Sequence, residues 1–213
     1  MSNEDEIVIE DHELDWSDND EIVIEDHELD LIYRTDEYTK EKLQSALTHF
    51  ESDVAFCKSF KESFHGKKKP TLPNFPGHIS ENIVKFILRK NGDKTVVWNC
   101  TGDLFSDMVS KIQVKCFSSD GASTFGPKTV WNNIYFLDTR DLFKKEGRII
   151  CYKVSLTSHS EEWRNIKISN KETFGEFCDK GKRPHITWKS LYQQISHKTE
   201  VVYDGTIEGI FEE

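Results

Sequence analysis

The chain has 213 residues, which is enough for one domain with a sizeable hydrophobic core and an additional tail. Its net charge of −10, taken as a whole, argues against a nucleic-acid partner, but the charges are unevenly distributed. Residues 1–30 hold 14 of the 38 acidic residues and no lysine or arginine, which leaves 24 acidic and 28 basic residues in the rest. The body of the chain is therefore mildly basic, at +4, and suits DNA binding.

The cysteines predict free thiols, because the five of them are widely spaced and no two form a Cys-x-x-Cys pair. They are Cys57, Cys100, Cys116, Cys151 and Cys178. The odd count and an acidic start unlike a signal peptide indicate a reducing, cytoplasmic setting. No apolar run approaches the roughly 20 residues that cross a bilayer, so we expect no membrane partner.

The first 30 residues contain a direct repeat, since Asp5–Asp15 recurs unchanged as Asp20–Asp30. Two short copies are too few for a solenoid, and the acidic composition predicts a disordered tail. We therefore expect a tail over residues 1–30 and one folded domain over residues 31–213. The tail could be a solvated appendage, or it could compete with DNA for a basic cleft.

Residues 36–64 predict a long amphipathic helix, because apolar side chains recur at helical spacing from Leu43 to Phe64. We expect this helix to build the core or a dimer contact. Three lysines at 67–69 follow it. They could contact phosphates without reading sequence, or form a solvated linker.

A second helix is predicted directly after Pro76, where an apolar series begins at Ile83. Ser80 is expected to cap its N-terminus, and Glu81 is expected in its first turn, where negative charge is favoured. This helix leads into a strand at residues 95–98, just before Asp103. Glu81 could therefore reach the same site as a further metal or water ligand, or it could only compensate the helix dipole.

The stretch from Asp103 to Lys115 holds the strongest chemical signal. Asp103 follows a turn, and Gln113 and Lys115 lie two residues apart on the next predicted strand, so their side chains point to one side. A carboxylate and an amide oxygen suit Mg²⁺, and the lysine could stabilise a phosphate and poise the attacking water. A plain alternating strand, with Ile112 and Val114 buried and the polar residues in water, fits the same letters.

A polar loop, residues 118–128, comes directly after that strand and contains hydroxyl groups and glycines that could approach DNA closely. Residues 180–185 form a second turn-rich stretch with basic side chains, next to Trp188. Either stretch could equally be an ordinary surface loop. The expected DNA contacts are Ser118, Ser119, Ser123, Thr124, Lys128, Lys182 and Arg183.

The remaining pattern predicts a mixed α/β (α+β) domain. An apolar strand over residues 131–138 and a second over 148–156, separated by a polar turn, indicate a hairpin. Short helices are expected over residues 158–164, 174–178 and 190–195.

The order of these segments resembles the PD-(D/E)XK nuclease superfamily, and within it the type II restriction endonucleases. The Asp-x₉-Gln-x-Lys spacing is similar to the superfamily signature. The ordered set of Ser-Glu helix, Gly-Asp turn, catalytic strand, Ser-Thr-Phe-Gly-Pro loop and apolar strand resembles small enzymes that cut palindromes. The resemblance covers roughly residues 70–155. Two departures are that Gln113 stands where Glu or Asp is usual, and that no proline precedes Asp103.

This resemblance implies a restriction-endonuclease-like core, with a mixed central β-sheet flanked by helices. It also implies Mg²⁺-dependent cleavage of double-stranded DNA at a specific site by a homodimer. Asp103 and Gln113 would then hold the metal, Lys115 would stabilise charge, and Glu81 would assist. Two alternatives stay open. One is a structure-directed or repair nuclease of the same fold, and the other is an inactive DNA-binding protein, because Gln113 removes one carboxylate.

Overall fold

The structure is a computed structural model that describes residues 38–63, 73–99 and 103–212. All of these lie in one compact unit, Asp36–Glu213, to which the description below refers. The predicted tail over residues 1–30 and the lysine cluster at 67–69 lie outside the described residues. In the described part of the chain, no helix is long and apolar enough to cross a membrane.

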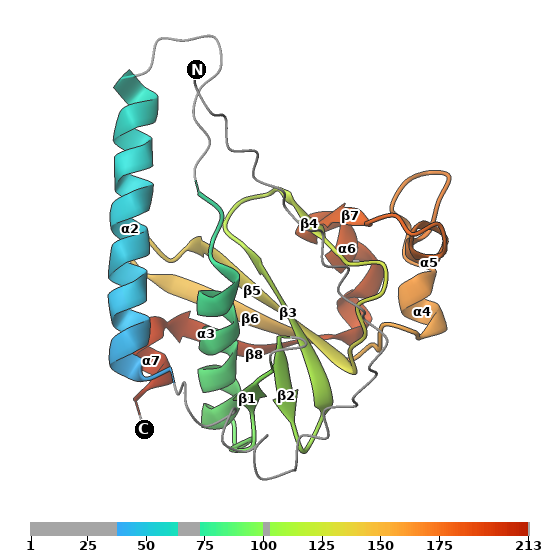
Figure 1. Ribbon diagram of the computed structural model, residues 1–213, viewed down its shortest axis with the longest axis horizontal. Helices are drawn as coiled ribbons and strands as arrows, with labels where there is room; N and C mark the ends of the chain where they lie inside the picture. Colours follow the sequence, from blue (N-terminus) through green and yellow to red (C-terminus); the bar gives the residue numbers. More distant parts are fainter. Residues whose placement is uncertain (1–37, 64–72, 100–102, 213) are drawn as a thin grey trace, which may run out of the picture. The chain divides into compact units, whose positions relative to one another are not determined.

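A six-stranded mixed sheet forms the centre of the domain (Figure 1). Its strands, in spatial order, are β1 (Val97–Trp98), β2 (Leu104–Ser106), β3 (Ser110–Phe117), β5 (Asn133–Asp141), β6 (Arg148–Val154) and β8 (Thr199–Thr206). Strands β3 and β5 are parallel, and every other neighbouring pair is antiparallel. The predicted mixed α/β class and the β5–β6 hairpin are confirmed.

Helices α2 (Lys40–Ser63) and α3 (Gly77–Lys90) cover one face of this sheet, and both fit the predicted periodicity. Alternation decides which strand residues meet them, because every second side chain of β3 points to their side. Ile112 and Val114 therefore share a core with Ile83 of α3. The short helix α7 (Ile207–Ile210) completes this layer.

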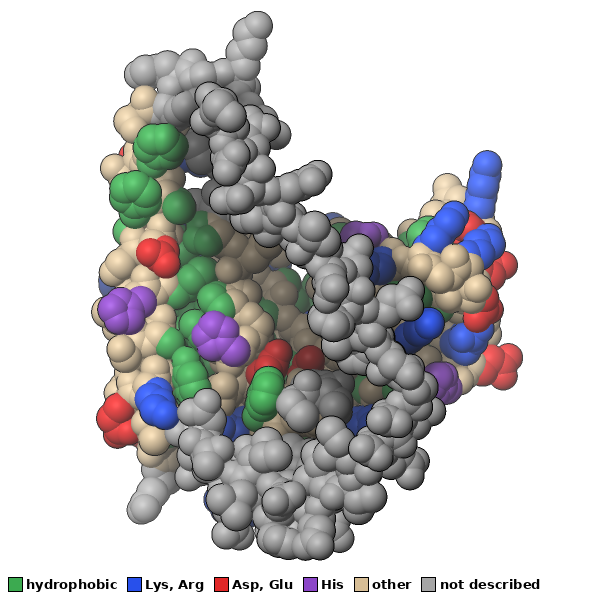
Figure 2. All heavy atoms as spheres, viewed as in Figure 1, with side chains coloured by type: hydrophobic (Ala, Val, Ile, Leu, Met, Phe, Trp, Pro, Cys, Tyr) green, Lys and Arg blue, Asp and Glu red, His purple; other side chains and the backbone are tan. Residues whose placement is uncertain are grey.

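The apolar stripe of α2 is buried only over the first half of the helix, which contributes to the core as expected. A dimer contact by this helix stays a prediction, and Phe64 lies outside the described residues. Leu43, Leu47 and Phe50 are buried, whereas Phe56 and Phe60 are 71% and 49% exposed. Figure 2 shows hydrophobic side chains gathered on the surface along α2.

The other face of the sheet is covered by short elements from the C-terminal part and by a small second sheet. These are α4 (Glu161–Arg164), α5 (Phe174–Asp179), α6 (Trp188–Ile195), and β4 (Ala122–Thr124) paired antiparallel with β7 (His185–Thr187). A mainly aromatic core, with Phe125, Trp131, Phe136, Trp163 and Phe174 among its members, fills the space beneath them. The three predicted short helices are confirmed.

Two local predictions are wrong. The helix begins at Gly77, after an extended Pro76, so Ser80 lies inside it and donates its hydroxyl to the carbonyl of Gly77 at 2.7 Å instead of capping. Glu81 therefore lies in the second turn and cannot compensate the first. The expected loop over residues 118–128 contains β4, because a partner strand more than 60 residues away pairs with it.

Candidate active site

Asp103 and Gln113 meet because the chain makes a tight antiparallel turn between β2 and β3. Leu104 pairs with Ile112, which places the preceding carboxylate beside the next residues of β3. The backbone N–H of Val114 donates to Asp103 Oδ2 at 2.5 Å, and Gln113 Nε2 donates to the same oxygen. The register of the β2–β3 hairpin therefore explains why two side chains that are nine intervening residues apart in sequence, Asp103 and Gln113, are in contact.

Lys115 lies two positions further along β3, on the same side of the sheet as Gln113. Its ammonium group is 5.6 Å from the centroid of the Phe125 ring, in cation–π geometry. Burial lowers the pKa of Lys115, and the charges of Asp103 and Glu81 act in the opposite direction. The lysine therefore belongs to a partly buried charge cluster and is not a solvated strand residue.

Glu81 reaches this cluster from α3. The indole Nε1 of Trp98, on β1, donates to Glu81 Oε2 at 2.8 Å and orients the carboxylate. Burial raises the pKa of Glu81, and the nearby charge of Asp103 raises it further, while Trp98 and Lys115 oppose the shift. The charges of Asp103 and Glu81 thus influence each other, with Glu81 in the second turn of α3. That Glu81 is a metal or water ligand stays a prediction.

The pKa of Asp103 is also raised, mainly by burial, and the N–H of Val114 and the charge of Lys115 partly offset this effect. Burial disfavours the ionised form of both carboxyl groups, and a cation bound between them would stabilise that form. Among the described residues, no group of three or more His, Cys, Asp and Glu side chains could hold a metal. The candidate oxygen ligands near Asp103 are its own carboxylate, the Glu81 carboxylate and the Gln113 amide.

This donor set fits Mg²⁺, which prefers oxygen ligands and commonly keeps several waters and a substrate phosphate in its shell. Asp103, Glu81 and Gln113 bring side-chain oxygens from three different elements. The Gln113 amide now offers its nitrogen to Asp103. Its oxygen makes no hydrogen bond within the described part of the chain and is free to face a cation after the amide turns.

A cavity of about 460 Å³ opens beside Asp103 and Gln113. Its opposite wall is the segment 126–130, which follows β4. Lys111 and Lys128 both line it and add positive charge. The site is thus a concave, cationic surface with a carboxylate at its base, which suits an extended polyanion.

The comparisons with known proteins agree with this geometry. The family model of the Bsp6I restriction endonuclease matches residues 38–197, about three quarters of the chain. This chain belongs to the Bsp6I restriction endonuclease family. No curated protein and no solved structure matches it. Membership of a restriction-endonuclease family identifies a nuclease whose partner is DNA, and the resemblance to type II restriction endonucleases is confirmed.

The predicted DNA contacts of this Bsp6I-family chain fall into two groups. Pairing of β4 with β7 brings Ser123 and Thr124 opposite Ile186 and His185, close to the chain that carries Lys182 and Arg183. Thr124 Oγ1 and His185 Nδ1 lie 3.0 Å apart across this pair. The charge of Arg183 helps to lower the pKa of Lys115, so this basic turn lies near the candidate active site.

The second group lies elsewhere. Ser118 and Ser119 line a separate cavity of about 200 Å³, which is bordered by α2 and by Arg140. Lys128 belongs to the first group, because it lines the cavity beside Asp103.

Three residues of this family member were missed at the level of sequence: Trp98, Lys111 and Arg140. The alternation of β3 could have revealed Lys111, since it has the same parity as Gln113 and Lys115. No local pattern marks Trp98, because its partner Glu81 is 17 residues away. Arg140 follows Asp138 by two residues and could have been noticed as a short-range ion pair.

Proposed function

We propose that this chain is a Mg²⁺-dependent, sequence-specific endonuclease of the PD-(D/E)XK type that hydrolyses phosphodiester bonds of double-stranded DNA. The observation that carries the proposal is the cluster of Asp103, Gln113, Lys115 and Glu81 in a chain of a restriction-endonuclease family. Asp103 and Gln113 of this cluster line a cavity together with Lys111 and Lys128. Concave sites with perturbed carboxylates and a lysine are typical of such chemistry.

Each side chain has a distinct task in this proposal. Asp103 and Gln113 hold the metal, and Glu81 holds a water or completes the ligand set. Bound Mg²⁺ would neutralise charge on the scissile phosphate and activate water. Lys115 donates hydrogen bonds to a phosphate oxygen that becomes more negative in the transition state, and it helps to orient the attacking water. Burial on the aromatic face of Phe125 limits the freedom of its ammonium group.

The proposed enzyme acts as a homodimer on a short palindromic site. A two-fold dimer places one active site on each strand of a two-fold-symmetric DNA sequence. The four described cysteines are free thiols, which suits the cytoplasmic setting included in the proposal. In this proposal the acidic residues 1–30 precede, in sequence, a nuclease domain over residues 31–213.

The direct test is incubation of the purified full chain with long unmethylated DNA and Mg²⁺, with Lys115→Ala as the matched control. Discrete fragments from the wild type alone would establish the restriction activity and reveal its recognition site. We expect Lys115→Ala to lose at least about a hundredfold in rate, because a preorganised charge next to the developing negative charge is removed. A smear that disappears in the variant would favour a structure-directed or repair nuclease.

One observation keeps a second candidate, an inactive DNA-binding protein, under test. Gln113 Nε2 donates a hydrogen bond to the Asp103 carboxylate and so occupies an oxygen that a cation would need. If the wild type binds DNA but neither binds Mg²⁺ nor cleaves, the Gln113→Glu variant tests whether Gln113 is the cause of the inactivity. Cleavage gained by this variant would show that the missing carboxylate alone prevents the reaction.

A further inference from the structure

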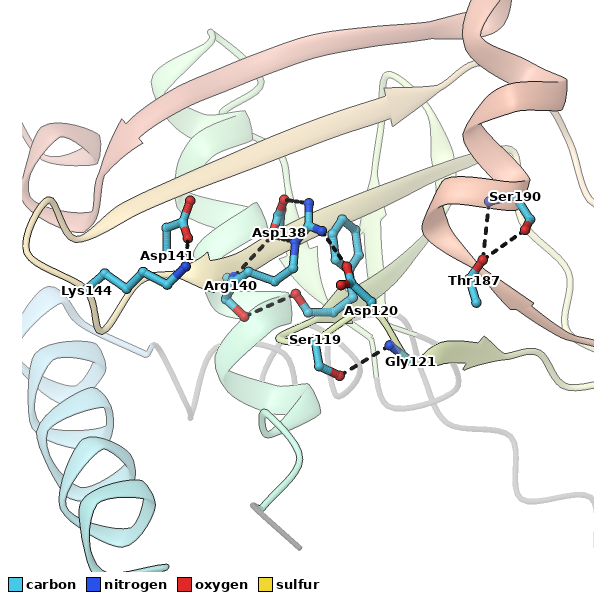
Figure 3. A network of polar contacts seen from close by, with 11 residues as sticks. Ser119, Asp120, Gly121, Asp138, Arg140, Asp141, Lys144, Thr187 and Ser190 are labelled. Atoms are coloured by element: carbon cyan, nitrogen blue, oxygen red, sulfur yellow. Dashed lines mark hydrogen bonds and ion pairs between the residues drawn. The ribbon is translucent and has the colours of Figure 1, made fainter. Parts of the chain in front are cut away.

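Arg140, near the end of β5, is anchored from below by a buried carboxylate (Figure 3). Its Nε donates to Asp138 Oδ1 at 3.0 Å, and its Nη2 donates to Asp138 Oδ2 at 2.8 Å. Asp138 is only 7% exposed, and its carboxylate also accepts the backbone N–H of Arg140. Two parallel hydrogen bonds of this kind fix the plane of the guanidinium group as well as its position.

The outer end of the same guanidinium is held quite differently. Nη1 donates to Asp120 Oδ1 at 2.7 Å, and the side chain of Asp120 is 90% exposed, on the chain between β3 and β4. An ion pair with so exposed a partner contributes little net stability, since water competes for both groups. Asp120 is therefore an exchangeable anion on a fixed cation, and Figure 3 shows Arg140 between its two carboxylates.

The position of Arg140 ties it to the candidate active site. Its guanidinium carbon lies 5.3 Å from the centroid of the Phe117 ring. Phe117 and Lys115 are two residues apart on β3 and point to the same face of the sheet, about 7 Å apart along the strand. Arg140 also lines the cavity that contains Ser118 and Ser119, the hydroxyls predicted to meet DNA.

We propose that Arg140 binds a backbone phosphate of the DNA duplex close to the scissile one, and that Asp120 occupies the place of that phosphate in the DNA-free protein. This inference rests on DNA being the substrate. When DNA binds, Asp120 leaves Nη1, one phosphate oxygen takes its position, and the pair of Arg140 with Asp138 stays intact.

The ligand is a phosphate and not a base edge, because the group that now fills the position is itself an anion. A carboxylate oxygen and a phosphate oxygen both accept from Nη1 with the same charge assistance. Contacts of this kind position a protein on DNA without reading sequence. Arg140 should therefore affect every duplex alike.

The test measures binding of the full chain to several short duplexes of unrelated sequence, without Mg²⁺, over a series of salt concentrations. Asp120→Asn should strengthen binding about threefold on every duplex, because it removes the competing anion. Arg140→Lys keeps the charge but loses the planar fork that holds Asp138 and a phosphate at the same time, so it should weaken binding about tenfold on every duplex. Circular dichroism checks that both variants are folded, and Asp120→Asn leaves the buried pair with Asp138 untouched.

Asp204→Asn is the matched control, since Asp204 forms a surface pair with Arg148 on the outermost strand, β8. It changes the net charge by the same amount away from β3. An equal gain in Asp120→Asn and Asp204→Asn would overturn the proposal, as would an effect confined to some sequences, which would indicate base reading. Because binding is measured without metal, failure of the nuclease proposal would leave this result interpretable.

Discussion

At the scale of single residues, the candidate active site contains carboxyl groups whose ionised form is destabilised by burial. Asp103 and Glu81 both have raised pKa values for this reason, and their partners only partly compensate. Functional sites often retain such groups at a cost in stability, because a rigid, poorly solvated carboxylate responds strongly to a cation. The raised pKa values of Asp103 and Glu81 have different testable consequences.

Asp103→Asn is expected to abolish cleavage and to raise the melting temperature of the metal-free protein at neutral pH. The folded protein raises the pKa of Asp103, so ionisation of this group opposes folding at any pH above the ordinary carboxyl pKa of about 3.9. The neutral amide removes that cost and can still accept from the N–H of Val114. The gain should therefore shrink as the pH falls toward about 4 and should be absent at lower pH, and thermal melts at several pH values measure it. A lower melting temperature at neutral pH would contradict the prediction.

Trp98→Phe is expected to reduce cleavage at neutral pH about threefold to tenfold, because Glu81 loses the Trp98 N–H that favours its charged form. The acid limb of the pH–rate profile should move to higher pH, since the pKa of Glu81 then rises further. A variant that only loosened packing would lower the rate without moving this limb. Glu81→Gln is the control, because its profile should no longer show the Glu81 limb at all.

At the scale of elements, long periodic segments were predictable, and short elements paired with distant partners were not. The apolar spacing of α2 and α3 and the alternation of β5 and β6 predict these elements from local sequence alone. Strand β8 was missed because it is an outer strand with many exposed residues and no clean alternation. Strand β4 was missed because its three residues form a strand only through β7.

The same distinction applies to the site. The spacing of Asp103, Gln113 and Lys115 follows from one hairpin and is visible in the sequence. The position of Arg183 near Lys115 depends on the pairing of β4 with β7. The hydrogen bond from Trp98 to Glu81 depends on how α3 packs near β1. Contacts of this kind arise from tertiary packing, which no single segment encodes.

Ile186→Ala tests the role of β7 in positioning the basic turn. Ile186 is 4% exposed within the aromatic core, so its truncation should cost about 2–4 kcal/mol of stability. It should also relax cleavage specificity at temperatures where the protein stays folded, because Lys182 and Arg183 then lose their support. Urea unfolding and digestion patterns measure the two effects. Val201→Ala, at a half-exposed position of β8, is the aliphatic control and should change neither.

At the scale of the whole molecule, the distribution of charge matters more than its total. The acidic segment, residues 1–30, carries −14, and the rest of the chain carries +4. Like charges on the tail and on DNA repel, and a tail close to the cationic cavity would compete with DNA for it. Both effects weaken as salt screens them.

Removal of residues 2–30 is therefore expected to strengthen DNA binding several-fold at low salt. The gain should shrink steadily as the salt concentration increases, because screening acts on the repulsion that the deletion removes. Fluorescence anisotropy with one duplex over a salt series measures the dissociation constants of the full chain and of the truncated protein. Equal affinity of the two proteins at low salt would show that the tail does not act on binding.

Asp103 lies in the chain between β1 and β2. These two strands are two and three residues long and form one edge of the sheet, while the longer β5 and β6 lie further inside. Edges of this kind open locally at a lower free energy than the whole domain. Mild denaturant should therefore detach the Asp103 carboxylate from β3 while the rest of the domain stays folded, so that cleavage is lost before global unfolding.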